Sequence, residues 1–157
     1  MSDLPDFTNY SQVDLVQQTI AFLTNRPMYG EAKRVYGSKL IDPQSRVTLV
    51  KIAGKGKIYG GCIFADTDHK VENDMIYICI DWYAVLAYEW NWFIRYNQTR
   101  INDFVAWATC YDDVNYIYNL AFMSDLTFEE DVEFEYSNKT SNSVYVGYEI
   151  IYSLLNV

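Results

Sequence analysis

Histidine is almost absent from this sequence, where His69 is the single copy. One histidine excludes sites that need two, such as the H-E-x-x-H zinc motif. The serine-hydrolase elbow G-x-S-x-G and the phosphate-binding loop G-x-x-x-x-G-K-[ST] are also missing. The chain therefore carries no complete catalytic motif, and we predict no cofactor and no metal site.

Cysteine is scarce as well, because only Cys62, Cys79 and Cys110 occur, at wide spacing. Each lies inside an apolar run, which predicts buried free thiols in a reducing compartment. The first residues are acidic where a secretion signal would be basic. No apolar run reaches the roughly 18 residues that a membrane span needs. We therefore expect a cytoplasmic protein that does not enter a membrane.

Basic residues are outnumbered, with 12 Lys and Arg against 21 Asp and Glu, and the net charge is −9. This charge argues against direct nucleic-acid binding, which needs a basic face against the phosphates. It suits a soluble protein with a basic partner. The 157 residues are 50% hydrophobic, enough to bury the core of one domain over residues 1–157.

Periodicity predicts an α+β fold with a single central sheet. Helices are expected at 11–24, more weakly at 31–40, and at 81–96 and 112–124, where Asp112 is placed to cap the last of them. Strands are expected at 46–53 and 57–65 as a hairpin, at 75–80 and 104–111, and at 128–136 and 144–152 as a closing hairpin.

The segment 81–96 is rich in aromatic residues, which also suits a strand. However, Trp82, Leu86, Trp90 and Phe93 fall on one face at helical spacing, and Asp81 is placed to cap a helix. The spacing therefore favours a helix.

The predicted order is α-(α)-β-β-β-α-β-α-β-β. Two short strings accompany it: Lys57–Phe64, a "G-K-hydrophobic-x-G"-like strand after a tight turn, and Phe122–Glu130, which is similar to an "F-Y-E-K-L-G-F" junction. Together these features resemble the GNAT superfamily, whose members transfer an acyl group from coenzyme A to an amine. The resemblance covers most of the chain and implies a mixed central sheet flanked by helices.

The catalytic parts of that family are missing from this sequence. The family binds the coenzyme pyrophosphate with a Q/R-x-x-G-x-G/A loop, whereas residues 81–88 contain no glycine and no basic residue. Met123 stands where the family often has its general-acid tyrosine, and Thr127 replaces a glycine. The resemblance therefore implies a degenerate scaffold, similar to small virion-associated proteins of short-tailed phages. The Tyr, Asn and Ile bias suits an AT-rich phage genome.

Two groups of residues are candidate contacts with a partner. Asp131, Glu133 and Glu135 alternate with apolar residues, which predicts an acidic ridge on one face of a strand. Trp90 and Trp92 cannot share the buried face of a helix, so one of them is a candidate interface anchor.

The loop Asp66-Thr67-Asp68-His69 is dense in acids. Carboxylates at short spacing suit a divalent metal, but a solvated loop between strands is the expected structure.

These observations favour a non-catalytic protein that acts by protein–protein contact or self-assembly, in a phage particle or in the host cytoplasm. One alternative is an acetyl-CoA-dependent N-acyltransferase with a divergent pyrophosphate loop. The other is an acidic inhibitor or immunity-type protein on an unrelated α+β fold.

Overall fold

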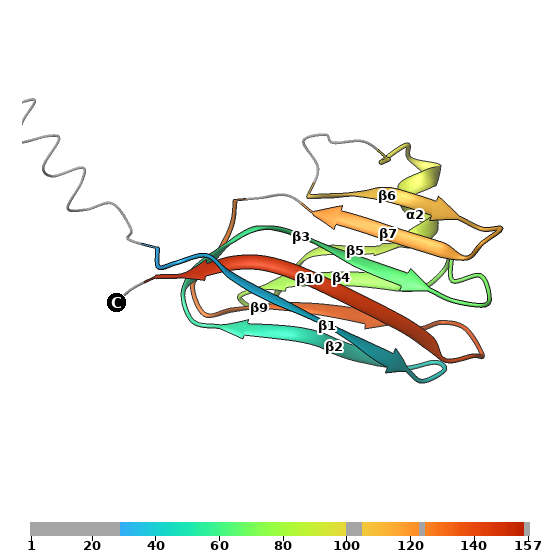
Figure 1. Ribbon diagram of the computed structural model, residues 1–157, viewed down its shortest axis with the longest axis horizontal. Coiled ribbons are helices and arrows are strands. Elements are labelled where there is room, and N and C mark those ends of the chain that lie inside the picture. The colour runs from blue at the N-terminus through green and yellow to red at the C-terminus, as the bar shows by residue number, and fades with distance from the viewer. Residues whose placement is uncertain (1–28, 100–104, 123–124, 156–157) are drawn as a thin grey trace, which may run out of the picture.

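The computed structural model describes residues 29–99, 105–122 and 125–155, which form two packed antiparallel β-sheets (Figure 1). The six-stranded sheet has the order β1-β10-β3-β7-β6, with β8 paired to β3. Its strands are β1 (Lys33–Ile41), β3 (Gly56–Asp66), β6 (Ala106–Asp112), β7 (Ile117–Phe122), β8 (Leu126–Phe128) and β10 (Val144–Leu154). The four-stranded sheet, in the order β2-β9-β4-β5, contains β2 (Arg46–Ala53), β4 (Met75–Ile80), β5 (Tyr83–Glu89) and β9 (Asp131–Ser137).

The chain crosses between the sheets at most of its connections. β1 pairs with β10 and β2 pairs with β9, so strands from the two ends of the described chain are neighbours. The arrangement of β1-β10-β3-β7 against β2-β9-β4-β5 is that of a jelly roll. Jelly rolls occur in viral capsid proteins, lectins and cupins, so the fold alone does not define a function.

Aromatic side chains between the sheets make up much of the core. The rings of Phe122 on β7 and Phe134 on β9 have centroids 5.1 Å apart and join the two layers. Trp90, the first residue of helix α2 (Trp90–Arg95), packs 5.7 Å from the ring of Tyr118 on β7. All four side chains are at most 3% exposed, so their burial contributes strongly to stability.

The predicted α+β class with a single central sheet is wrong. Among the described residues, α2 is the one α-helix, and it spans six residues. Residues 31–40, expected as a weak helix, contain most of β1, and residues 112–124 contain β7. A GNAT-like central sheet flanked by helices is incompatible with two stacked antiparallel sheets. The helix predicted at 11–24 lies outside the described residues.

The segment 81–96 shows why helical spacing was misleading. It consists of a turn at Asp81 and Trp82, then β5, and only then the short helix α2. Leu86 and Tyr88 lie opposite the buried residues of β4, but the register shifts by one residue just before Leu86. The four residues at helical spacing come from three different elements: exposed Trp82 from the turn, buried Leu86 from β5, and buried Trp90 and Phe93 from α2.

Asp112 makes the bonds of a helix cap without a helix following it. Its carboxylate Oδ1 accepts the backbone N–H groups of Val114 and Asn115 at 2.8 and 2.9 Å. This bonding closes the turn between β6 and β7 instead, as aspartate commonly does in turns.

The predicted strands are confirmed to within about three residues as β2, β3, β4, β6, β9 and β10. Both predicted hairpins are wrong, because β2 and β3 lie in different sheets, as do β9 and β10. Gly54, with φ of 111°, allows the chain to turn from β2 toward the other sheet.

The three cysteines are free, as predicted, but each is half-buried rather than buried. Burial raises the pKa of the Cys62 and Cys79 thiols. As for membrane insertion, the described part of the chain contains no helix with the length and apolar character of a membrane span.

Candidate interaction site

The two-residue connection between β4 and β5 has an unusual backbone. Asp81 has φ of 47° and Trp82 has φ of 74°. A hairpin turn with positive φ at both positions favours Asn-Gly or Asp-Gly, because glycine has no Cβ to clash. Tryptophan therefore occupies a position where glycine is preferred. Residues 81–83 are called the Trp82 turn below.

Asp81 anchors this turn to the start of β9. Its carboxylate accepts backbone N–H bonds from Glu129, Glu130 and Asp131, with lengths from 2.7 to 3.1 Å. In addition, the Asp81 N–H donates to the Asp131 carbonyl at 3.0 Å. The bonds from Glu130 and Glu129 lower the pKa of the Asp81 carboxyl, because they stabilise its charged form.

The Trp82 side chain is held in one orientation while its surface stays open to solvent. Its indole Nε1 donates to the Glu130 carboxylate at 2.9 Å, and Lys51 Nζ lies 5.0 Å from its ring centroid. Trp82 nevertheless remains 74% exposed and the adjacent Tyr83 77% exposed. Two consecutive aromatic side chains are therefore exposed at an anchored turn.

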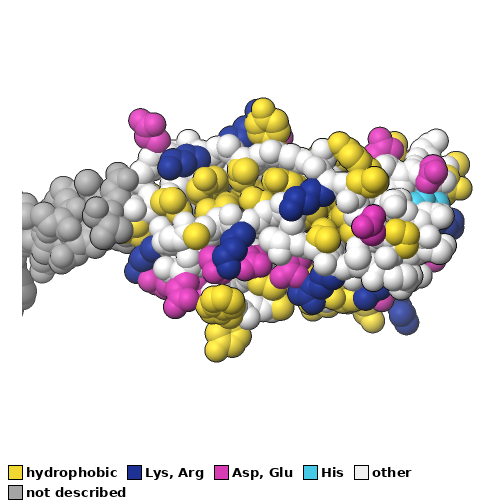
Figure 2. Space-filling model, turned by 90° about the horizontal axis from the view of Figure 1, so that it is seen from below, with side chains coloured by type: hydrophobic (Ala, Val, Ile, Leu, Met, Phe, Trp, Pro, Cys, Tyr) yellow, Lys and Arg dark blue, Asp and Glu magenta, His cyan; other side chains and the backbone are white. Residues whose placement is uncertain are grey.

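The predicted acidic ridge lies beside this turn, on the outer face of the four-stranded sheet. Lys51 of β2 pairs with Asp131 at 2.8 Å and also with Glu133, and Arg46 pairs with Glu135. We call these five residues the charge ladder. Figure 2 shows acidic and basic side chains gathered along one side of the molecule, next to a band of hydrophobic side chains.

The charge ladder is largely neutralised by the chain's own cations. The two carboxylates beside Lys51 raise the pKa of its ammonium group, and the guanidinium of Arg46 also stacks 3.7 Å from the Tyr77 ring centroid. A hollow of about 260 Å³ remains between the ladder and Trp82. The three acids therefore form a row of ion pairs rather than a bare negative ridge.

The structure separates the two predicted tryptophans from the acids. Trp90 is fully buried. Trp92 is half-buried, and its ring stacks on Tyr88 with centroids 4.0 Å apart. The tryptophan beside Asp131, Glu133 and Glu135 is Trp82, not Trp90 or Trp92.

Trp82 and Tyr83 were missed as contact residues because residues 81–96 were assigned to a helix. The available signal was Asp81 directly after the apolar run 75–80, because aspartate is common in turns. The signal was weak, because Trp82 stands where a hairpin turn of this kind usually has glycine.

Asp74 forms a second polar cluster, inside the sandwich. Its side chain is 0% exposed and accepts bonds from the Tyr136 hydroxyl at 2.9 Å and the Lys139 N–H at 2.6 Å. Trp90 Nε1 donates to the same hydroxyl at 3.0 Å. Burial raises the pKa of Asp74, although these bonds oppose the shift. The cluster ties β4, β9 and α2 together and has no exposed surface for a ligand.

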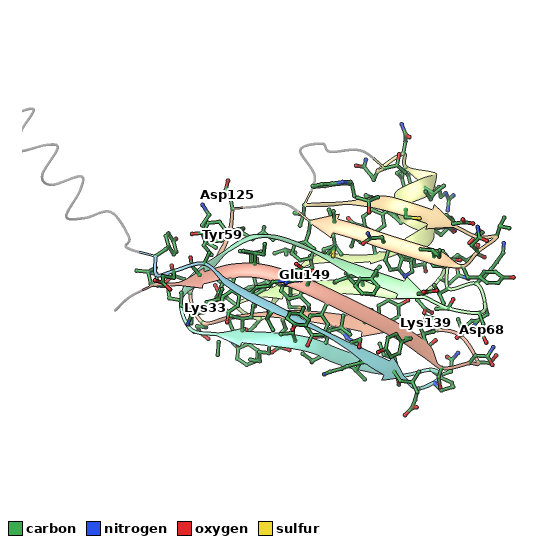
Figure 3. The ribbon with its side chains drawn as sticks, viewed as in Figure 1. Lys33, Tyr59, Asp68, Asp125, Lys139 and Glu149 are labelled. Atoms are coloured by element: carbon green, nitrogen blue, oxygen red, sulfur yellow. The ribbon has the colours of Figure 1, made fainter. Side chains whose placement is uncertain are left out.

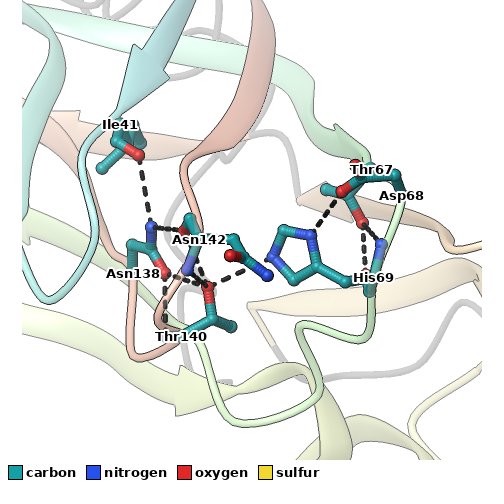
Figure 4. Close-up of polar contacts among 7 residues, drawn as sticks. All are labelled: Ile41, Thr67, Asp68, His69, Asn138, Thr140 and Asn142. Carbon is teal, nitrogen blue, oxygen red and sulfur yellow. Dashed lines mark hydrogen bonds and ion pairs between the residues drawn. The ribbon is translucent and has the colours of Figure 1, made fainter.

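The acidic loop after β3 makes structural contacts. His69 lies between Asp68, with Nδ1 to Oδ1 at 2.6 Å, and Thr140, with Nε2 to Oγ1 at 3.2 Å (Figure 4). Asp68 and Lys139 are on neighbouring loops at one end of the sandwich (Figure 3). Within the described ranges, no three His, Cys, Asp or Glu side chains are grouped as ligands for a metal ion.

No known family matches the chain, and no curated protein is significantly similar to it. The case for a function therefore depends on the described surfaces.

Proposed function

We propose that this chain is a non-catalytic jelly-roll module that binds a partner protein through the Trp82 turn. The observation that carries this proposal is the backbone of Asp81 and Trp82, which presents two highly exposed aromatic rings at the cost of positive φ values. Unfavourable backbone geometry persists where the surroundings enforce it, and such positions cluster at functional sites.

The Trp82 turn is preorganised for binding. The Asp81 carboxylate holds the backbone, and Glu130 and Lys51 hold the indole ring. Little conformational freedom would then be lost on association, and a rigid anchor raises affinity by reducing that loss. Tryptophan and tyrosine are also the residues most enriched at the energetic centres of interfaces.

The surroundings of the turn define the chemistry of the partner. The carboxylates of Asp81 and Glu130 lie at the turn, whereas the carboxylate of the neighbouring Glu129 pairs with Lys55. Together with the chain's net charge of −9, this favours a partner surface that combines apolar side chains with Lys or Arg.

A peptide-display selection tests this proposal. Random peptides would be selected on the immobilised full-length chain and then compared on the double variant Trp82→Ser, Tyr83→Ser. We expect enriched peptides to combine aromatic or aliphatic residues with Lys or Arg. We also expect them to bind the double variant at least tenfold more weakly.

Tyr145→Ser is the matched control, because Tyr145 is an exposed tyrosine on the other sheet. It should leave peptide binding unchanged. The proposal fails if no peptide is enriched, if the enriched peptides are acidic, or if they bind the double variant as well as the unmodified chain.

A further inference from the structure

The outer face of the six-stranded sheet, on the side of the sandwich opposite the charge ladder, has a hollow of about 350 Å³. Tyr36 and Ser38 of β1, Phe64 of β3, and Tyr145 and Glu149 of β10 contribute to its lining. Figure 3 shows Glu149 near the middle of β10. The volume falls at the lower end of the roughly 300–1,000 Å³ range of small-molecule sites.

The aromatic lining depends on a glycine in β10. Gly147 lies opposite Phe64 across the β3–β10 ladder, and a Cβ on Gly147 would lie 2.1 Å from Phe64 Cζ. The missing side chain therefore allows the Phe64 ring to extend across β10. Tyr36, Tyr145 and Phe64 remain 69%, 51% and 39% exposed, so three ring surfaces face solvent around one hollow.

Polar groups stand beside these rings. The hydroxyls of Ser38 and Tyr145 are 2.6 Å apart, and either can donate or accept a hydrogen bond. Arg34 Nε donates to the Glu149 carboxylate at 2.8 Å, and the guanidinium lies 4.8 Å from the Tyr36 ring centroid. The hollow thus combines apolar ring surface with hydroxyls and one neutral ion pair.

The rings, hydroxyls and ion pair of the hollow favour some classes of ligand over others. A purely apolar ligand would cover the hydroxyls and the ion pair without offering them hydrogen bonds, which is unfavourable. An anionic ligand would meet the carboxylate of Glu149, and the ion pair presents no excess positive charge. A neutral sugar ring offers C–H surface to the aromatic rings and hydroxyls to Ser38, Tyr145 and the ion pair.

We propose that this hollow binds a neutral sugar ring, through Tyr36, Phe64 and Tyr145 as stacking surfaces and through Ser38 and Glu149 as hydrogen-bonding groups. The site shares no residue with the Trp82 turn. It therefore stands or fails independently of the protein-binding proposal.

Binding of the fluorescently labelled full-length chain to an array of neutral and anionic glycans tests this site. We expect neutral glycans to be bound, and Tyr145→Ala and Tyr36→Ala to weaken this binding at least tenfold. Tyr145→Phe keeps the ring and removes the hydroxyl, so the loss should be smaller, about two- to fivefold. Tyr96→Ala, at an exposed tyrosine that follows α2 and lies outside both proposed sites, should bind as the unmodified chain does.

Circular dichroism would verify that each variant is folded, and the strongly exposed Tyr36 offers a second variant if Tyr145→Ala does not fold. The proposal is overturned if no neutral glycan is bound, if only anionic glycans are bound, or if binding survives both alanine variants. It is also overturned if sedimentation shows a dimer that Tyr145→Ala dissociates, because the hollow would then be covered by a second copy of the chain.

Discussion

The two outer faces of this sandwich differ in the side chains that they expose to solvent. On the four-stranded sheet, Arg46 and Lys51 pair with the acids of β9 across the ladder. On the six-stranded sheet, the rings of Phe64 and Tyr145 remain partly exposed, and Gly147 leaves room for the Phe64 ring.

This difference shows where each face can bind. Exposed ion pairs contribute little to stability and are satisfied within the chain, so the charge ladder offers a partner few free groups. The exposed part of an aromatic ring, in contrast, has no partner within the chain that a ligand would have to displace. On the four-stranded sheet, exposed aromatic surface is concentrated at the Trp82 turn, whereas on the six-stranded sheet it surrounds the hollow. We therefore expect a protein partner at the turn and a sugar at the hollow.

The largest expected effect on stability comes from a substitution in the core between the two sheets. This substitution affects folding and lies outside both proposed binding sites. Tyr136→Phe removes the hydroxyl that joins Trp90 to Asp74. Two buried polar groups then lose a partner, so we expect a loss of about 3 kcal/mol in the free energy of unfolding by urea. Tyr77→Phe, on the outer face, should change it by less than about 0.5 kcal/mol. Equal losses for both variants would contradict the buried network.

Gly147→Ala tests the packing of the six-stranded face. The new methyl would meet the Phe64 ring, so the ring must rotate away, at about 1–3 kcal/mol by urea unfolding. In a double-mutant cycle, Phe64→Ala should remove most of this loss, because the space is then free. A loss that persists without Phe64 would show that glycine is needed for another reason.

The sequence allowed us to predict which residues of a strand face outward, but not how the strands pair into sheets. The alternation of acids in 131–135 identified the outer face of β9 correctly, because side-chain direction in a strand is local. The pairing of β2 with β9 instead of β3 depends on contacts distant in sequence, which no local periodicity encodes. The Trp82 turn was missed because Trp82, Leu86 and Trp90 are four residues apart, a spacing that fits both a helix and a strand.

Arg46→Met tests the charge ladder and should have a smaller effect. It removes the pair with Glu135 and changes the packing on Tyr77. We expect about 0.5–1 kcal/mol less stability by urea unfolding in low salt. In 1 M NaCl the difference should shrink, because salt screens exposed charges. A difference that does not depend on salt would show that packing, not charge, holds this face.

The smallest expected effect is a pH dependence of opposite sign at two aspartates. Burial raises the pKa of Asp74 above its unfolded value of about 3.9, so its contribution to stability is full below that pH and is lost as pH rises through the folded pKa. Hydrogen bonds lower the pKa of Asp81, so its contribution is present above about pH 3.9 and is lost as pH falls through the folded pKa.

These two contributions are measured by urea unfolding of the unmodified chain, Asp74→Asn and Asp81→Asn between pH 2 and 7. The advantage of the unmodified chain over Asp74→Asn should shrink as pH rises from about 4. Its advantage over Asp81→Asn should shrink as pH falls below about 4. The same pH trend in both variants would contradict the assigned environments.

The most direct test of the central claim is an NMR titration of the ¹⁵N-labelled full-length chain with a basic peptide obtained by display. The indole N–H signal of Trp82 is assigned by its loss in Trp82→Phe. We predict that the peptide shifts this signal and the amides of residues 81–83 and 129–131, and leaves those of 36–38 and 145–149 unchanged. A peptide that binds without shifting the Trp82 indole, or that shifts the amides of the hollow instead, would contradict the assignment of the turn as the protein-binding site.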